Sequence, residues 1–169
     1  MPMQSMDELF HNLLQDIYYA EKQLLKTLPK LAKKSTNEKL QEAFTIHCDE
    51  TKGHIERLEK VFAMIGKKPH AKTCDAILGI IAEGQEVMEE AKDDSVRDAG
   101  ILAAAQAAEH YEFARYGTLQ AWAEMLGQDE AVDLLEETSQ EENHADALLT
   151  SISQGGVNEG AAERPRAAE

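Results

Sequence analysis

The sequence is poor in the residues that interrupt helices and in aromatic side chains. It contains 4 prolines, 10 glycines and 5% aromatic residues in 169 positions. Alternating runs of β-branched residues, which would predict strands, are nearly absent. Apolar residues instead recur every three or four positions, so we expect an all-α protein. A chain of this length can bury a sizeable core, and we expect one domain.

Positive charge is also scarce. Lys and Arg number 17 against 32 Asp and Glu, which gives a formal net charge of −15 at pH 7. Such a surface repels nucleic-acid phosphates and anionic lipids, so we expect neither nucleic acid nor membrane as a partner. No apolar run approaches the ~18 residues that cross a bilayer, and the polar N-terminus lacks the pattern of a signal peptide. The two cysteines, Cys48 and Cys74, form no disulfide framework. We therefore expect a cytoplasmic protein.

The sequence predicts four long amphipathic helices and one shorter helix. Ser5 and Glu8 form a capping box that begins the first helix, which bends at Pro29 and ends near Lys34. The second helix follows the N-cap residue Asn37 and ends at a glycine, residue 66. The short helix is expected at 75–91, and the third long helix at 96–126. The last long helix should begin after an N-cap at residue 129 and end at the glycine pair 155–156.

The connection between the second and third long helices is too long for a simple turn. It covers roughly 30 residues, and the short helix within it spans ~26 Å at 1.5 Å per residue, close to the length of the bundle. The chain can therefore return to the end from which the second helix started. This arrangement is a ferritin-like four-helix bundle with one long crossover carrying a fifth, shorter helix. We expect the bundle to cover residues 1–154 and a polar, disordered tail to cover residues 155–169.

Acidic and histidine side chains interrupt the apolar faces of the first two helices. At 100° per residue, Glu21 falls on the inward side of the first helix. The stretch HCDETKGH places His47, Glu50 and His54 on the inward side of the second. Gly53 stands where an E-x-x-H pattern would place its histidine, so His47 and His54 both remain candidate ligands.

The last two long helices show the same feature. Glu109 and Glu112 share one face of the third long helix. In the last helix, Glu141 is expected near the centre of the inward face, with His144 at its edge, as E-x-x-H. The other residues expected on that face are Leu134, Thr138, Ala145, Leu148 and Ile152. Counted from the connecting turns, these residues lie about 15 positions along each helix, so one layer in the middle of the bundle should collect acids from all four helices.

A dry layer of carboxylates needs compensation, because burial disfavours their charge and they repel one another. No inward Lys or Arg is expected at this depth. Two divalent cations bridged by carboxylates, with histidines as terminal ligands, provide the compensation. Oxygen and nitrogen ligands without thiolates favour two iron ions, with manganese as the alternative, over structural zinc. Protonated carboxyl groups that hydrogen-bond one another are the competing interpretation. No catalytic residue is assigned.

The chain resembles the YciE/YciF group of ferritin-like bacterial stress proteins over about residues 6–150. The resemblance rests on segments that include DIYYAEKQLLKTLPKLAK, HCDETKGHIERL and VRDAGILAAAQAAEHYEFARYGTLQAWAEMLG. It implies a dimeric four-helix bundle, similar to rubrerythrin, with two iron ions in a carboxylate-rich centre. The residues that match the family's pattern are His47, Glu50, Glu109, Glu112 and Glu141, whereas His54 and His144 depart from it.

Two functional hypotheses follow. The first is a di-iron or di-manganese carboxylate protein that oxidises Fe(II) or consumes O₂ or peroxide as a small substrate in a stress response. The second is a structural or interaction bundle that forms a homodimer, with a vestigial or regulatory metal site and no turnover. The sequence leaves open whether the protein is an enzyme.

Overall fold

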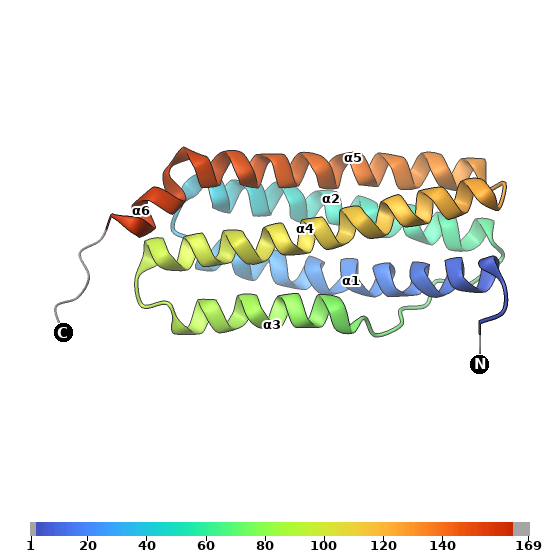
Figure 1. Ribbon diagram of the computed structural model, residues 1–169, viewed down its shortest axis with the longest axis horizontal. Coiled ribbons are helices and arrows are strands. Elements are labelled where there is room, and N and C mark those ends of the chain that lie inside the picture. The colour runs from blue at the N-terminus through green and yellow to red at the C-terminus, as the bar shows by residue number, and fades with distance from the viewer. Residues whose placement is uncertain (1–2, 164–169) are drawn as a thin grey trace.

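The computed structural model describes residues 3–163. Its main elements are four long helices and one shorter helix packed along them (Figure 1). The elements are α1 (Met6–Lys34), α2 (Glu38–Met64), α3 (Asp75–Glu90), α4 (Asp94–Met125), α5 (Asp129–Ile152), the π-helical turn η1 (Ser153–Val157) and α6 (Asn158–Ala162). This part of the chain contains no strand, so the all-α prediction is confirmed.

The helices have the predicted crossover topology. In Figure 1, α2 and α4 run in the same direction, and α1 and α5 run antiparallel to them. The connection between α2 and α4 contains α3, which packs against α4 and α1 and carries the chain back along the bundle. The predicted ferritin-like arrangement, four helices with one long crossover that carries a fifth, is therefore confirmed.

Local signals set most of the helix ends. The side chains of Ser5 and Asn37 accept backbone N–H bonds at the starts of α1 and α2. Pro29 lies inside α1 without ending it. Gly66 and Gly127, after α2 and α4, both have φ of 68°, a left-handed conformation that favours glycine at a helix end. These positions agree with the sequence patterns.

The last part of the chain differs from the prediction in two details. Asp129 is the first residue of α5, and Gln128 occupies the N-cap position. The chain also continues past Gly156 into α6, although a tail was expected from residue 155. Val157 is buried with Ile152 in an apolar cluster, and this contact holds the end of the chain against the bundle. The rest of the predicted tail, 164–169, lies outside the described residues.

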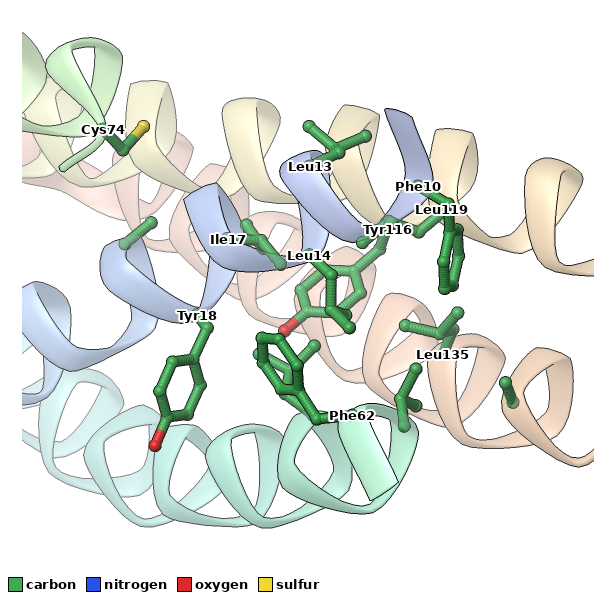
Figure 2. Close-up of a cluster of buried hydrophobic side chains, with 14 of the residues drawn as sticks. Phe10, Leu13, Leu14, Ile17, Tyr18, Phe62, Cys74, Tyr116, Leu119 and Leu135 are labelled. Atoms are coloured by element: carbon green, nitrogen blue, oxygen red, sulfur yellow. The ribbon is translucent and has the colours of Figure 1, made fainter. Parts of the chain in front are cut away.

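Two apolar clusters fill the bundle on either side of its middle. One joins residues near the start of α1, the end of α2, the second half of α4 and the start of α5. Figure 2 shows this cluster, in which Leu14, Phe62 and Tyr116 from three helices point toward one another. The other joins the opposite ends of the same helices. None of the described helices has a stretch long and apolar enough to cross a membrane.

A buried carboxylate ties the two helical hairpins together. The Asp98 side chain, in α4, accepts hydrogen bonds from the backbone N–H groups of Thr36 (2.8 Å) and Asn37 (2.9 Å). It also accepts one from the Thr36 hydroxyl at 2.7 Å. Because these residues form the turn between α1 and α2, Asp98 fixes the register of the first hairpin against α4. That register decides which side chains meet in the middle of the bundle.

Candidate metal centre

A layer of buried polar side chains separates the two apolar clusters. Its members are Glu21 of α1, His47 and His54 of α2, Glu109 and Glu112 of α4, and Glu142 of α5, all 0–5% exposed. We call these six residues the buried cluster. No Lys or Arg is among the buried residues in the described part of the chain. The cluster therefore has four acids and two imidazoles but no permanent positive charge.

Helical spacing brings these side chains to one level. In α2, His47, Thr51 and His54 lie on one buried face, spaced four and three residues apart. In α4, Glu109 and Glu112 are three residues apart and both are buried. Glu142 occupies the corresponding inward position of α5. The sequence therefore places a polar side chain where the helical repeat would otherwise place an apolar one.

Glu142 contacts both imidazoles. Its Oε2 atom lies 3.4 Å from His47 Nε2, and its Oε1 atom lies 3.1 Å from His54 Nδ1. Glu109 Oε1 is 3.2 Å from His47 Nε2, and Glu21 Oε1 is 3.2 Å from His54 Nδ1. The two imidazole rings are 5.8 Å apart between centroids. The cluster thus has two halves, one around each histidine, joined by one carboxylate.

Both halves have the geometry of a metal-binding group. Potential ligand atoms lie within 4.8 Å of one another in each of two groups. One group is His47, Glu109, Glu112 and Glu142, and the other is Glu21, His54 and Glu142. Because Glu142 belongs to both, its two oxygens can bridge two ions, as carboxylates do in dinuclear centres.

Several of these oxygens lack hydrogen-bond partners. Both carboxylate oxygens of Glu112 have none, nor does one oxygen each of Glu21 and Glu109. The oxygens of Glu142 lie near His47 and His54 but form no hydrogen bond of good geometry. A buried polar atom without a partner costs about 1–3 kcal/mol. Divalent cations would satisfy these atoms, and oxygen and nitrogen donors without thiolates suit iron or manganese. The residues present therefore fit two such ions.

Without cations, the cluster favours protonated groups. Burial raises the pKa of Glu112 well above its ordinary value, and the nearby Glu142 carboxylate raises it further. Burial also raises the pKa of Glu142, as does the charge of Glu109. Burial alone would lower the pKa of His54, but neighbouring carboxylates, chiefly Glu21, raise it to about 9. Protons can therefore substitute for cations, the competing interpretation from the sequence.

Two contacts hold the cluster from outside. The Tyr116 hydroxyl, itself buried, donates a hydrogen bond of 2.5 Å to Glu21 Oε1. Glu50 Oε2 lies 3.1 Å from His47 Nδ1 and can accept a hydrogen bond from the N–H group at that position. This contact leaves His47 Nε2 facing Glu109 and Glu142, in the way that outer carboxylates orient histidine ligands.

The structure brings together five of the eight side chains predicted as ligands: Glu21, His47, His54, Glu109 and Glu112. Glu50 lies at the edge, where its side chain is 26% exposed. Its contact with His47 suggests an orienting position rather than one inside the cluster. Whether any of these residues binds metal stays a prediction.

The predicted orientation of the last helix is wrong. The Glu141 side chain is 31% exposed and bonds to Arg57 Nη1 at 2.7 Å, and His54 Nε2 lies 2.9 Å from the same oxygen. His144 is exposed. Arg57 also contradicts the expectation that no basic side chain stands at this depth, and it neutralises Glu141. Together with His54, it lowers the pKa of Glu141, although partial burial acts in the opposite direction.

The residue that the sequence analysis missed is Glu142. The predicted inward face used Leu134 and Leu148, whereas Leu135 and Leu149 are the ones buried. One residue corresponds to 100° of rotation, which exchanges Glu141 for Glu142. Periodicity gave no signal for this choice, because the face through Leu134, Glu141 and Leu148 and the face through Leu135, Glu142 and Leu149 both repeat in steps of four and three. The buried positions include Ala131, Leu135, Thr138, Glu142, Ala145, Leu149 and Ile152.

Comparisons with known proteins agree with the resemblance noted in the sequence. Residues 5–162 match the family described as "Domain of unknown function (DUF892)". Protein YciF of Escherichia coli K12 is 45% identical over 159 residues, covering 94% of this chain and 96% of that protein.

Two solved structures share the fold. The Escherichia coli stress protein YciF has a TM-score of 0.88 at 45% identity, covering 92% of this chain and 99% of that one. YcfI of Rhodopseudomonas palustris, described as a candidate structural protein, has a TM-score of 0.86 at 48% identity, covering 88% and 94%. The chain therefore belongs to the DUF892 family, which confirms the predicted kinship with the YciF stress proteins.

Proposed function

We propose that this protein is a ferritin-like carboxylate protein that holds two iron ions, or two manganese ions, in the buried cluster. We further propose that it oxidises Fe(II) or consumes O₂ or peroxide in a stress response. The observation that carries the proposal is the position of Glu142, which is fully buried, lies within 3.4 Å of His47 and 3.1 Å of His54, and belongs to both groups of ligand atoms.

Each side chain has a role in this proposal. His47, Glu109 and Glu112 would hold one ion, Glu21 and His54 would hold the other, and Glu142 would contribute to both sites. Two bound irons supply the electrons that reduce O₂ or peroxide. The protein supplies buried ligands in fixed positions and the Tyr116 hydroxyl, which donates a hydrogen bond to Glu21 Oε1 and holds that carboxylate in place. The description of the relative YciF as a stress protein supports the physiological part of the proposal.

Anaerobic titration of metal-free protein with Fe(II), followed by O₂, tests the proposal. About two irons should bind per chain, and O₂ should produce the near-ultraviolet absorption of ferric iron. Titration with Mn(II), alone and in competition, shows which metal is preferred. If neither metal binds, the proposal is wrong.

A second candidate function is a structural bundle that binds metal without turnover. The description of YcfI, 48% identical to this chain, as a candidate structural protein favours it. It predicts metal binding that raises the stability of the fold while O₂ and peroxide persist at the rate of a metal-only control. The predicted homodimer is a separate proposal, because all residues of the buried cluster belong to one chain, and sedimentation equilibrium can test it.

A further inference from the structure

We propose that divalent cations reach the buried cluster through a hollow between α2 and α5, with Glu50 and His144 as their first ligands on the way in. This inference rests on the proposed function, because it concerns access to the same centre. It gives a role to two residues that the sequence singled out and that do not belong to the buried cluster.

A cavity of about 60 Å³ lies between α2 and α5, and its lining includes both exposed residues and members of the buried cluster. Its polar lining includes Glu50 and His144 on the outer side and His47 and Glu109 on the inner side. His144 is exposed and Glu50 is partly exposed, whereas His47 and Glu109 are buried ligand candidates. An ion in this cavity would meet a carboxylate and an imidazole before it meets the cluster.

A larger hollow of about 440 Å³ adjoins the cavity on its outer side. The two share Ala43, Ile46 and Leu148 in their linings. Ile46 is 48% exposed, so it stands at the junction between solvent and the inner cavity. The passage from solvent to His47 is therefore lined along one face of α2 and one face of α5.

The position of Glu50 would allow it to bind an ion at the surface and transfer it toward the buried cluster. Its carboxylate lies 3.1 Å from His47 Nδ1, while the other nitrogen of that ring faces Glu109 and Glu142. Negative charge beside a narrow passage raises the local concentration of cations and their association rate. Because Glu50 is 26% exposed, its charge can act on ions that are still hydrated.

Other surroundings of the cluster are less suited to cations. Farther along the same seam, the guanidinium of Arg57 bonds to Glu141 at 2.7 Å and to Glu137 at 2.6 Å, so these two carboxylates are already paired and less available to a passing cation. Between α1, α3 and α4, a cavity of about 30 Å³ also reaches His47 and Glu109. Both cavities have many apolar residues in their linings, but this one has no carboxylate or imidazole outside the cluster, so an ion would have no ligand there before it reaches His47 and Glu109.

Charge changes at Ile46 test the route without altering a proposed ligand. We would mix metal-free protein with Co(II) in a stopped-flow spectrometer and follow the visible absorption of bound cobalt. Ile46→Glu should raise the association rate constant, and Ile46→Lys should lower it, by about threefold or more at low ionic strength. The same two changes at Met125, which is 72% exposed at the end of α4, provide the matched control and should have smaller effects.

A second pair of variants tests Glu50 itself. Glu50→Gln keeps an oxygen that can accept the His47 Nδ1–H bond but removes the charge. It should slow association by about threefold or more. Because Glu50 also orients His47, the Ile46 variants, which change no ligand and no contact of His47, decide whether the slower rate reflects the route. Glu56→Gln, an exposed position on α2, makes the same change in net charge and should leave the rate unaltered.

The outcomes separate the two proposals. If wild-type protein binds no Co(II), Fe(II) or Mn(II), the proposed function is wrong and the route is wrong with it. If metal binds but the Ile46 variants and Glu50→Gln have wild-type association rates, only the route is overturned. Opposite effects of Ile46→Glu and Ile46→Lys, absent at Met125, would support the passage between α2 and α5.

Discussion

Glu141 and Glu142 are consecutive residues of α5 with opposite environments. The Glu142 side chain is fully buried between His47 and His54, whereas the Glu141 side chain is 31% exposed and pairs with Arg57. One carboxylate is neutralised by a guanidinium, and the other has no such partner. The two residues therefore provide a test of the metal centre in which mutation and control are adjacent.

Glu142→Gln should greatly weaken metal binding. The amide has one oxygen and no charge, so it cannot bridge two ions, and we expect at least a tenfold loss of affinity at one site or both. Isothermal titration of metal-free protein with Mn(II) or anaerobic Fe(II) measures this loss. Glu141→Gln is the control and should retain two ions per chain with a smaller change in affinity. The reverse ranking would show that α5 presents Glu141 to the metals.

The metal-free protein should lose stability as the pH rises. The folded-state pKa values of Glu112 and Glu142 are raised from the ordinary value of 4.5, and that of His54 is raised from 6.5 to about 9. Between about pH 4.5 and pH 9, the folded state therefore binds more protons than the unfolded state. This contribution to stability is fully present below about pH 4.5 and is lost as the pH rises through the folded-state values, up to about 9 for His54.

Urea denaturation at several pH values between 5 and 9 measures this dependence. Saturating metal should reverse its sign over at least part of the range, because metal ligands must be deprotonated and binding releases protons. A metal-free stability that increases steadily with pH would contradict the assignment of raised pKa values to the cluster.

Glu112→Met should stabilise the metal-free protein and weaken metal binding. Both carboxylate oxygens of Glu112 lack partners, and an apolar side chain of similar length removes that penalty, so we expect a gain of about 1–3 kcal/mol in the free energy of unfolding. Glu124→Met, at an exposed position of the same helix, should change stability by less than about 0.5 kcal/mol. Destabilisation by Glu112→Met in metal-free protein would indicate that Glu112 has a partner within the fold.

Gly100→Ala should destabilise the packing of the crossover helix. A Cβ atom at Gly100 would lie 2.1 Å from Cγ1 of Val87, so either the Val87 side chain must leave its rotamer or α3 and α4 must move apart, at a cost of about 1–3 kcal/mol. Gly79 lies in α3 with nothing near its would-be Cβ, and Gly79→Ala should stabilise the protein by up to about 1 kcal/mol. Thermal unfolding of the two variants gives the comparison. Equal effects would show that α3 packs less closely on α4 than this contact requires.

Much of the fold was predictable because its signals are local. Ser5 and Asn37 mark helix starts through their own side chains, and Gly66 marks a helix end through its conformation. The crossover followed from length, since a connection containing a helix of nearly bundle length must return the chain. In contrast, nothing local predicted that Asp98 would bond to the α1–α2 turn, since that contact joins residues 61 and 62 positions apart.

The site was partly predictable for a related reason. In α1, α2 and α4, the polar residues lie within apolar faces that are clear from the sequence, so Glu21, His54 and Glu112 could be placed inward. In α5, the pairs Leu134–Leu135 and Leu148–Leu149 allow two faces that differ by one residue. Periodicity alone does not decide between them.

The sequence by itself determined an all-α bundle with a crossover and a polar layer in its middle, because these features depend on periodicity, capping residues and spacing along each helix. Only the tertiary structure decided that Glu142 completes the layer and that Arg57 withdraws Glu141 from it. The physical reason is that rotation of a helix about its axis is set by packing against its neighbours. For α5, the buried contacts of Leu135 and Leu149 fix that rotation and turn Glu142 inward.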